Sequence, residues 1–435
     1  MEFACLAQES AEKFNGMPME TDLRIDLPFI EQYARRKNSF LTGRFDDLSL
    51  YTALQPIFSI AHKRVVGYEA LLRVKNRESQ WISPAPLFEK TGNPFADVHL
   101  DRLCRYIHLN NFLNLKDDIN WLFLNVSPVT LSNAQIYGPF FRDLIESFNF
   151  PAHRIVIEVV EHPFDDNDFL KETVGFYKNL GCLIAIDDFG AGHSNFDRIW
   201  TLKPHIVKLD RSFLIKASME KSIRSLLPGI VSLLHQAGSL VLMEGIETRD
   251  QAIISIESDA DFVQGFYFAK PSTGLCPSFE ADFKGFDSLQ EQYKTLTSGE
   301  DLRFQKKINR YRTAFNDAVT RLMDGLSFEK SAQTLLSQPS VVRCYQIGAD
   351  GIQIGNTLVS PALESHRNDC YKPLDDAKNA DWFRRHYLKR ALLHPGQLQI
   401  SRPYLSITGA HMCITLSMKL SNRDQETVLC CDLLA

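Results

Sequence analysis

Short apolar runs alternate with longer amphipathic segments between about residues 50 and 270. Eight runs have strand length and are rich in Val, Ile, Leu and Phe: Leu54–Ile60, Val65–Leu72, Trp121–Val126, Arg154–Val160, Leu183–Asp187, His205–Leu209, Leu240–Met243 and Phe262–Phe268. The later runs are almost continuously apolar, as strands buried on both faces are. Helix-length segments such as Phe169–Leu180 and Ser222–Gln236 separate them. This alternation predicts an α/β fold of the (β/α)8 barrel type.

Local features of the linking segments refine this prediction. Only residues 61–64 separate the first two runs, which is too short for a helical crossover, so we expect an antiparallel hairpin there. Gly181 and Gly238 each stand just past a predicted helix and shortly before a strand, as helix stops in a repeating β–α unit do. Pro228 lies inside Ser222–Gln236, where we expect that helix to begin or to kink.

The pattern changes after about residue 285. Apolar residues recur every three or four positions and predict one long amphipathic helix: Phe304, Ile308, Tyr311, Phe315, Val319 and Leu322. Strand-like runs follow at Val341–Ile347, Ile352–Gly355, Leu398–Arg402, Met412–Met418 and Thr427–Cys431. Residues 348–351 have the composition of a hairpin turn. These patterns predict a C-terminal α+β domain with an antiparallel sheet.

Four parts of the chain can therefore be delimited. Residues 1–44 form an N-terminal extension, in which we interpret residues 35–37 (Arg-Arg-Lys) as a solvated helix end. The barrel covers residues 45–285, a connecting amphipathic helix covers 286–325, and the C-terminal domain covers 326–435.

Charge and cysteine content exclude several classes of protein. The chain has 48 basic and 53 acidic residues, so its net charge of -5 gives no reason to expect DNA binding or an acidic membrane surface. We find no run of about 18 apolar residues and no secretory signal, so we expect no membrane span and a cytoplasmic location. The nine cysteines include no Cys-x-x-Cys, and we expect free, buried thiols rather than disulfides or a thiolate zinc site.

Carboxylates and one amide stand at the ends of the predicted strands. They are Glu69, Asn125, Glu158, Asp187, Asp188 and Glu244. Function sits at the carboxyl end of the strands in a barrel, so these groups should converge on one mouth. So much negative charge in a low-dielectric site is costly unless cations neutralise it. Oxygen ligands without Cys or His indicate Mg²⁺ or Mn²⁺, and their number suffices for two ions, which suits displacement at a phosphate.

Spacing distinguishes the roles of neighbouring acids. Asp187 and Asp188 face opposite sides of a strand unless the strand ends there, and Gly190 supplies such a break, so that Asp187 could bridge two ions. Glu158 and Glu161 lie three residues apart and cannot share a strand face. We therefore expect Glu158 to be the ligand and Glu161 to hold the loop at 188–195.

These residues resemble the EAL-domain family of cyclic di-GMP phosphodiesterases over about residues 48–285. The family is named for a Glu-Ala-Leu triplet, here at 69–71, and the other matching segments are 55–57, 124–127, 158–161, 187–190, 208–210, 244–247 and 264–265. The resemblance implies a modified triose-phosphate-isomerase-type barrel whose first strand is antiparallel. Departures fall in the 188–195 loop at Ala191, His193 and Asn195, and at Met243. None of these departures is an inferred metal ligand.

The resemblance also implies roles for individual residues. Glu69, Asn125, Glu158 and Asp187 would bind one metal, and Asp187, Asp188 and Glu244 would surround the second. Lys208 would position the hydrolytic water and offset developing charge, and Gln264 would help orient that water. Arg73 would contact a phosphate, Gln55 a nucleotide, and Asp210 and Glu247 the substrate region, while Glu161 would anchor the active-site loop. The implied reaction opens cyclic di-GMP to linear pGpG.

The C-terminal part more loosely resembles Cache/PAS-like sensor domains. Residues 381–387 and 401–405 carry this likeness, which implies a pocket for a small ligand of unknown identity; core aromatics and surface arginines explain them equally well. By family resemblance we expect a homodimer. Two alternatives to an active phosphodiesterase are a non-catalytic cyclic di-GMP receptor, which typically lacks metal ligands that this chain retains, and an interaction scaffold with a vestigial barrel.

Overall fold

The computed structural model describes residues 24–37, 39–88, 93–126, 140–160, 167–191, 196–273, 285–361, 377–406, 411–422 and 425–434. The chain divides into two compact units, Met1–Thr295 and Leu296–Ala435. The finer domain limits given above remain predictions.

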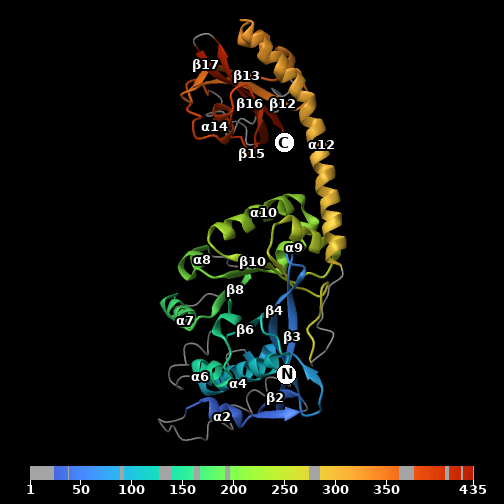
Figure 1. Cartoon of the computed structure of the whole chain (residues 1–435), viewed down its shortest axis with the longest axis vertical. Coiled ribbons are helices and arrows are strands. Elements are labelled where there is room, and N and C mark those ends of the chain that lie inside the picture. The colour runs from blue at the N-terminus through green and yellow to red at the C-terminus, as the bar shows by residue number, and fades with distance from the viewer. Residues whose placement is uncertain are drawn as a thin grey trace. The chain divides into compact units, whose positions relative to one another are not determined.

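Eight strands of the first unit close into a barrel (Figure 1). They are β3 (Leu48–Ser59), β4 (Arg64–Lys75), β6 (Trp121–Asn125), β7 (Ile155–Val160), β8 (Leu183–Phe189), β9 (Ile206–Leu209), β10 (Leu240–Met243) and β11 (Phe262–Val263). β3 is antiparallel to both β4 and β11, whereas the other neighbouring strands of the ring are parallel. The predicted barrel and its antiparallel hairpin are confirmed, since the short turn at 61–64 allows no crossover.

Helices flank the strands of this barrel. They are α3 (Ala85–Phe88), α4 (Pro94–Leu113), α6 (Phe141–Ser147), α7 (Asn167–Asn179), α8 (Phe196–Leu202), α9 (Arg211–Met219), α10 (Lys221–Gln236) and α11 (Arg249–Glu257), with a 3₁₀ turn at Ala152–Arg154 and a short strand β5 at Trp81–Ile82. An apolar cluster that includes Val156, Ile206 and Leu242 lies on alternate strand positions. Because side chains alternate along a strand, Val156 and Ile206 share a face with Glu158 and Lys208, two residues further on. The apolar cluster inside the barrel thus lies next to a polar layer formed at the carboxyl ends of the strands.

The N-terminal extension differs from the prediction. Residues 35–37 belong to strand β1 (Ala34–Lys37), which pairs with β2 (Phe40–Phe45), and β2 pairs with β3. The predicted helix end was wrong because strand pairing overrides the local charge pattern, although the three basic residues are solvent-exposed as expected. A short helix, α2 (Leu27–Glu31), begins after Asp26, whose side chain accepts a hydrogen bond from Phe29 N at 3.1 Å.

Two further element boundaries depart from the predictions. Helix α10 begins at Lys221 and continues through Pro228, so Pro228 does not start the helix. The eighth strand ends at Val263 rather than at Phe268. Gly265 explains the early end: a Cβ there would lie 2.1 Å from Ile246 O, so only glycine permits the close approach of these two segments.

The second unit contains an antiparallel sheet, as predicted. Its strands are β12 (Val341–Gly348), β13 (Gln353–Val359), β14 (Gln399–Ile400), β15 (Tyr404–Leu405), β16 (Met412–Asn422) and β17 (Gln425–Leu434), in the order β13-β12-β17-β16-β14 with β15 beside β16. Its helices are α13 (Phe328–Leu336) and α14 (His386–Leu393), and the predicted long helix is α12 (Phe286–Met323). The predicted turn at 348–351 joins β12 to β13.

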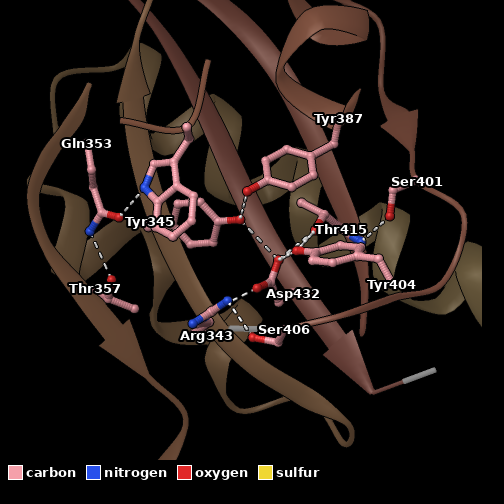
Figure 2. Close-up of polar contacts among 11 residues, drawn as sticks. Arg343, Tyr345, Gln353, Thr357, Tyr387, Ser401, Tyr404, Ser406, Thr415 and Asp432 are labelled. Atoms are coloured by element: carbon pink, nitrogen blue, oxygen red, sulfur yellow. Dashed lines mark hydrogen bonds and ion pairs between the residues drawn. The ribbon is translucent and has the colours of Figure 1, made fainter. Parts of the chain in front are cut away.

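A buried polar network lies within this sheet (Figure 2). Asp432 is fully buried and accepts hydrogen bonds from Arg343 Nε and Thr415 Oγ1, both at 2.7 Å. Tyr345 OH lies 3.2 Å from Asp432 Oδ1 and 3.0 Å from Tyr387 OH. The network satisfies a carboxylate that burial would otherwise make costly. A Cache/PAS-like identity for this unit stays a prediction.

A search of the described helices finds none that is both long and apolar enough to cross a membrane.

Candidate active site

The predicted carboxylates come together at the carboxyl ends of the barrel strands. Strand register places them there: Asn125 of β6 pairs with Glu158 of β7, and Val160 of β7 pairs with Asp187 of β8. Glu69 lies in β4, and Glu244 directly follows β10. Parallel strands end at the same rim of a barrel, so residues from distant parts of the chain face one space.

Lys208 stands at the centre of this group. Its Nζ lies 2.5 Å from Glu158 Oε1, 2.8 Å from Glu244 Oε1 and 2.9 Å from Asp187 Oδ1. Glu69 Oε1 is further away, at 3.8 Å. One buried ammonium thus faces four carboxylates, and the local charge stays strongly negative.

Burial and charge change the acidity of these groups. Burial raises the pKa of Glu158 well above its usual value; Lys208 opposes the shift, and the negative charges of Glu69 and Asp187 add to it. Burial also raises the pKa of Glu244 well above its usual value, again against Lys208. For Lys208 burial favours the neutral amine, but the surrounding carboxylates outweigh it and hold the pKa well above the usual value.

Two amides complete the inner surface of the site. Gln264 Nε2 donates to Glu69 Oε2 at 2.6 Å, and Asn125 Nδ2 donates to Glu69 Oε1 at 3.2 Å. These bonds fix the orientation of the Glu69 carboxylate between β6 and the segment after β11. The Gln264 Oε1 atom is buried and accepts no hydrogen bond from any residue that the structure describes.

Asp188 adopts a left-handed backbone conformation, with φ of 55°, which residues other than glycine rarely take. The pairing of β8 with β9 is irregular at this point, between Ile186 and Phe189. Consequently one carboxylate oxygen each of Asp187, Asp188 and Glu244 lies within 4.8 Å of the others. Strand β8 ends at Phe189, directly before the Gly190 break expected from the sequence, and the left-handed backbone already at Asp188 lets both aspartates reach one place.

The oxygen atoms of this site are suitable ligands for divalent cations. Neither oxygen of the fully buried Glu158 carboxylate accepts a hydrogen bond of normal geometry from the described residues, although Oε1 is close to the Lys208 ammonium. Buried carboxylate oxygens without donors are costly, and hard cations such as Mg²⁺, Mn²⁺ or Ca²⁺ satisfy them. Glu69, Asn125, Glu158, Asp187, Asp188 and Glu244 would supply the ligands.

The predicted substrate contacts lie around this centre. Gln55 is opposite Glu69 in the β3–β4 register, and its Nε2 donates to Ala269 O at 3.1 Å. Arg73 Nη1 donates to Leu72 O at 2.8 Å, while burial lowers the pKa of Arg73 and Glu69 opposes the shift. Asp210 caps helix α9 by accepting from Ser212 N at 3.0 Å.

Two predicted residues remain, Glu247 and Glu161. Glu247 is exposed, with its Oε1 4.0 Å from Arg211 Nη1. Glu161, the predicted loop anchor, lies outside the described residues, as does His193.

The fold and site define an acidic barrel of the kind that the sequence resemblance implies. The family model of the EAL domain matches residues 41–271. The chain therefore belongs to the EAL-domain family. The predicted family is confirmed at this level.

Individual relatives extend the comparison. The EAL-domain protein YkuI of Bacillus subtilis is 32% identical over 354 residues, which are 79% of this chain and 83% of YkuI. The crystal structure of YkuI with cyclic di-GMP and calcium shares the fold, with a TM-score of 0.68 and 24% identity over 90% of this chain and 97% of that one. The probable cyclic di-GMP phosphodiesterase PdeG of Escherichia coli is 27% identical over 229 residues, half of this chain and 44% of PdeG.

Proposed function

We propose that this protein is a metal-dependent phosphodiesterase that hydrolyses cyclic di-GMP to linear pGpG. The observation that carries the proposal is the ring of four carboxylates around Lys208 at the barrel mouth, with a buried Glu158 Oε2 that accepts no hydrogen bond from the described residues. Membership of the EAL-domain family supports it. So do the relatives: PdeG is a probable cyclic di-GMP phosphodiesterase, and YkuI is known with that dinucleotide and calcium.

Two Mg²⁺ or Mn²⁺ ions held by these ligands would neutralise the carboxylates and supply activation of water at neutral pH. Lys208 and Gln264 would then position the water: Lys208 through its ammonium, and Gln264 through an Oε1 atom directed away from its bond to Glu69. Glu69 and Glu244, both near the Lys208 ammonium, would orient the nucleophile toward phosphorus. These residues would act by positioning and by electrostatic stabilisation, which are the main sources of catalysis in phosphoryl transfer.

Substrate binding falls to the surrounding residues. Arg73 would turn from Leu72 O to a phosphate oxygen, and Gln55 would contact a nucleotide. Asp210 and Glu247 lie on segments that directly follow strands at the mouth and would complete the substrate region. Glu161 would anchor the 188–195 loop. A homodimer and regulation through a Cache/PAS-like C-terminal domain with its own small ligand complete the proposal.

The competing proposal is a receptor that binds cyclic di-GMP without turning it over. Equilibrium binding of cyclic di-GMP in Ca²⁺, followed by product chromatography after exchange into Mg²⁺ or Mn²⁺, separates the two. Binding followed by pGpG supports the enzyme. Binding with no product in either metal supports the receptor.

A further inference from the structure

A second concave site lies at the opposite end of the barrel from the carboxylates. It is a cavity of about 680 Å³, lined by the β3–β4 turn, by the first residues of β6, β10 and β11, and by Tyr293 of α12. All of its lining residues belong to the unit Met1–Thr295. We propose that this cavity binds a neutral, planar heteroaromatic small molecule.

The floor of the cavity is aromatic and apolar. Trp121 and Phe262 meet edge to face, with ring centroids 5.8 Å apart, and Val66 packs beside them on the apolar cluster inside the barrel. The volume falls within the range of roughly 300–1,000 Å³ that is usual for small-molecule sites. Rings of this kind favour a flat aromatic occupant, which stacks on one ring and meets the edge of the other.

The rim carries both hydrogen-bond donors and acceptors but little net charge. Asp261 is already engaged, because its Oδ2 lies 2.8 Å from both His235 Nε2 and Val241 N. The guanidinium of Arg64 and the carboxylate of Asp259, which also belong to the lining, have opposite charges that leave little net charge. A neutral ligand with both donor and acceptor edges fits this rim better than an anion or a cation does.

Two exposed apolar side chains mark the opening. Ile119 is 69% exposed and Leu240 is 41% exposed, and both line the cavity. Covering them would add hydrophobic stabilisation to the complex.

The cavity also adjoins the attachment of α12. Lys63 Nζ of the β3–β4 turn lies 2.6 Å from Asp287 Oδ1, and Gln290 Nε2 donates to Ile60 O at 3.3 Å. An occupant would therefore touch the turn and Tyr293 at the same time. Because β3 and β4 carry Gln55 and Glu69 further along, binding would stabilise the hairpin that reaches the catalytic end.

The test uses the full chain and ligand-observed NMR with four probes: indole and quinoline, which are neutral heteroaromatics, and benzoate and benzylammonium, which are charged. Ala61, an exposed residue of the turn that lines the cavity, is changed to Trp to fill it. Ala85→Trp, at an exposed site on α3, is the matched control. Indole and quinoline should bind the native chain and the control saturably, and Ala61→Trp should weaken both by about tenfold or more.

Binding that is equal in Ala61→Trp and the control, or stronger for benzoate or benzylammonium, would overturn the proposal. Tyr293→Ala removes one wall and should weaken indole binding as well, which keeps the test decisive if Ala61→Trp does not fold. The readout is binding at the far end of the barrel, so it does not depend on whether cyclic di-GMP is hydrolysed.

Discussion

Lys208 Nζ lies 2.5 Å from Glu158 Oε1, and the side chains are 1% and 0% exposed. They come from β9 and β7, on either side of β8, which carries Asp187. A buried charge of either sign is expensive alone, so in the protein without metal the carboxylates of the site depend on the one ammonium of Lys208. The same ammonium also approaches Asp187 and Glu244, and it therefore organises the whole acidic site.

Lys208→Met should destabilise the metal-free protein. The substitution leaves four carboxylates without their central cation, and breaking a buried ion pair by removing one partner costs about 3–5 kcal/mol. We expect a lower free energy of unfolding in EDTA, measured by urea denaturation at pH 7, and partial recovery in Mn²⁺. Hydrolysis of cyclic di-GMP should also fall.

Lys63→Met is the control for this variant, since Lys63 pairs with Asp287 where the two side chains are 40% and 85% exposed. Exposed pairs contribute about 0–1 kcal/mol. Equal losses of stability in the two variants would show that Lys208 is not the central countercharge.

Glu158→Gln should separate metal binding from folding. The change removes one of several like charges and keeps the shape of the side chain, so stability in EDTA should hold or rise. Metal affinity by calorimetric titration should fall, and turnover should decrease on the order of a hundredfold or more. Native metal affinity in this variant would remove Glu158 from the ligand set.

His99 should make stability depend on pH. Rings of Phe29, Tyr33, Phe45 and Phe95 surround it, its Nε2 is buried without a partner among the described residues, and burial lowers its pKa to about 4. The folded state therefore holds the imidazole neutral, while the unfolded chain binds a proton below about pH 6.5. This stabilisation is present above pH 6.5 and is lost as the pH falls toward 4.

Between pH 7 and pH 5 the native chain should lose about 2 kcal/mol more of its free energy of unfolding than His99→Phe does. Urea denaturation at both pH values measures this difference. His153→Phe, at an exposed position, should keep the native pH dependence. A His99→Phe chain with unchanged pH dependence would contradict the explanation.

Asp432→Asn should destabilise the second unit. It removes the carboxylate that holds the buried Arg343, whose pKa is raised by Asp432 and Tyr345 against the effect of burial. The expected loss is about 3–5 kcal/mol. Hydrogen exchange should accelerate in β16 and β17 and stay unchanged in β7 and β8.

Asp317→Asn, which breaks an exposed pair with Arg321, should leave exchange in both units unchanged. Unaltered protection of β17 in Asp432→Asn would show that the network contributes little to stability.

Much of the barrel could be predicted because each of its strands is an apolar run and the turn at 61–64 is short. The strand β1 could not, since Arg35 and Arg36 have no apolar alternation and the strand exists only through pairing with β2. The end of β11 at Val263 could not be predicted from the local sequence pattern either. It depends on the close approach of Gly265 to Ile246, which lies in a different segment of the chain.

The candidate site shows a similar division. Convergence of Glu69, Glu158 and Glu244 followed from the rule that parallel strands end at one rim. The contact of Lys208 with all four carboxylates could not be predicted, since it depends on side-chain length and burial across several strands. The left-handed backbone of Asp188 is likewise visible only in three dimensions.

Chromatography of cyclic di-GMP incubated with the purified chain and Mg²⁺ or Mn²⁺, with Glu69→Ala in parallel, measures whether the acidic site hydrolyses the dinucleotide. The Glu69 carboxylate is held by Gln264 and Asn125 within the predicted metal site, so its removal should abolish turnover while circular dichroism shows a retained fold. We expect pGpG from the native chain alone. Hydrolysis at the native rate by a folded Glu69→Ala chain, or no product from the native chain with either metal, would contradict this expectation.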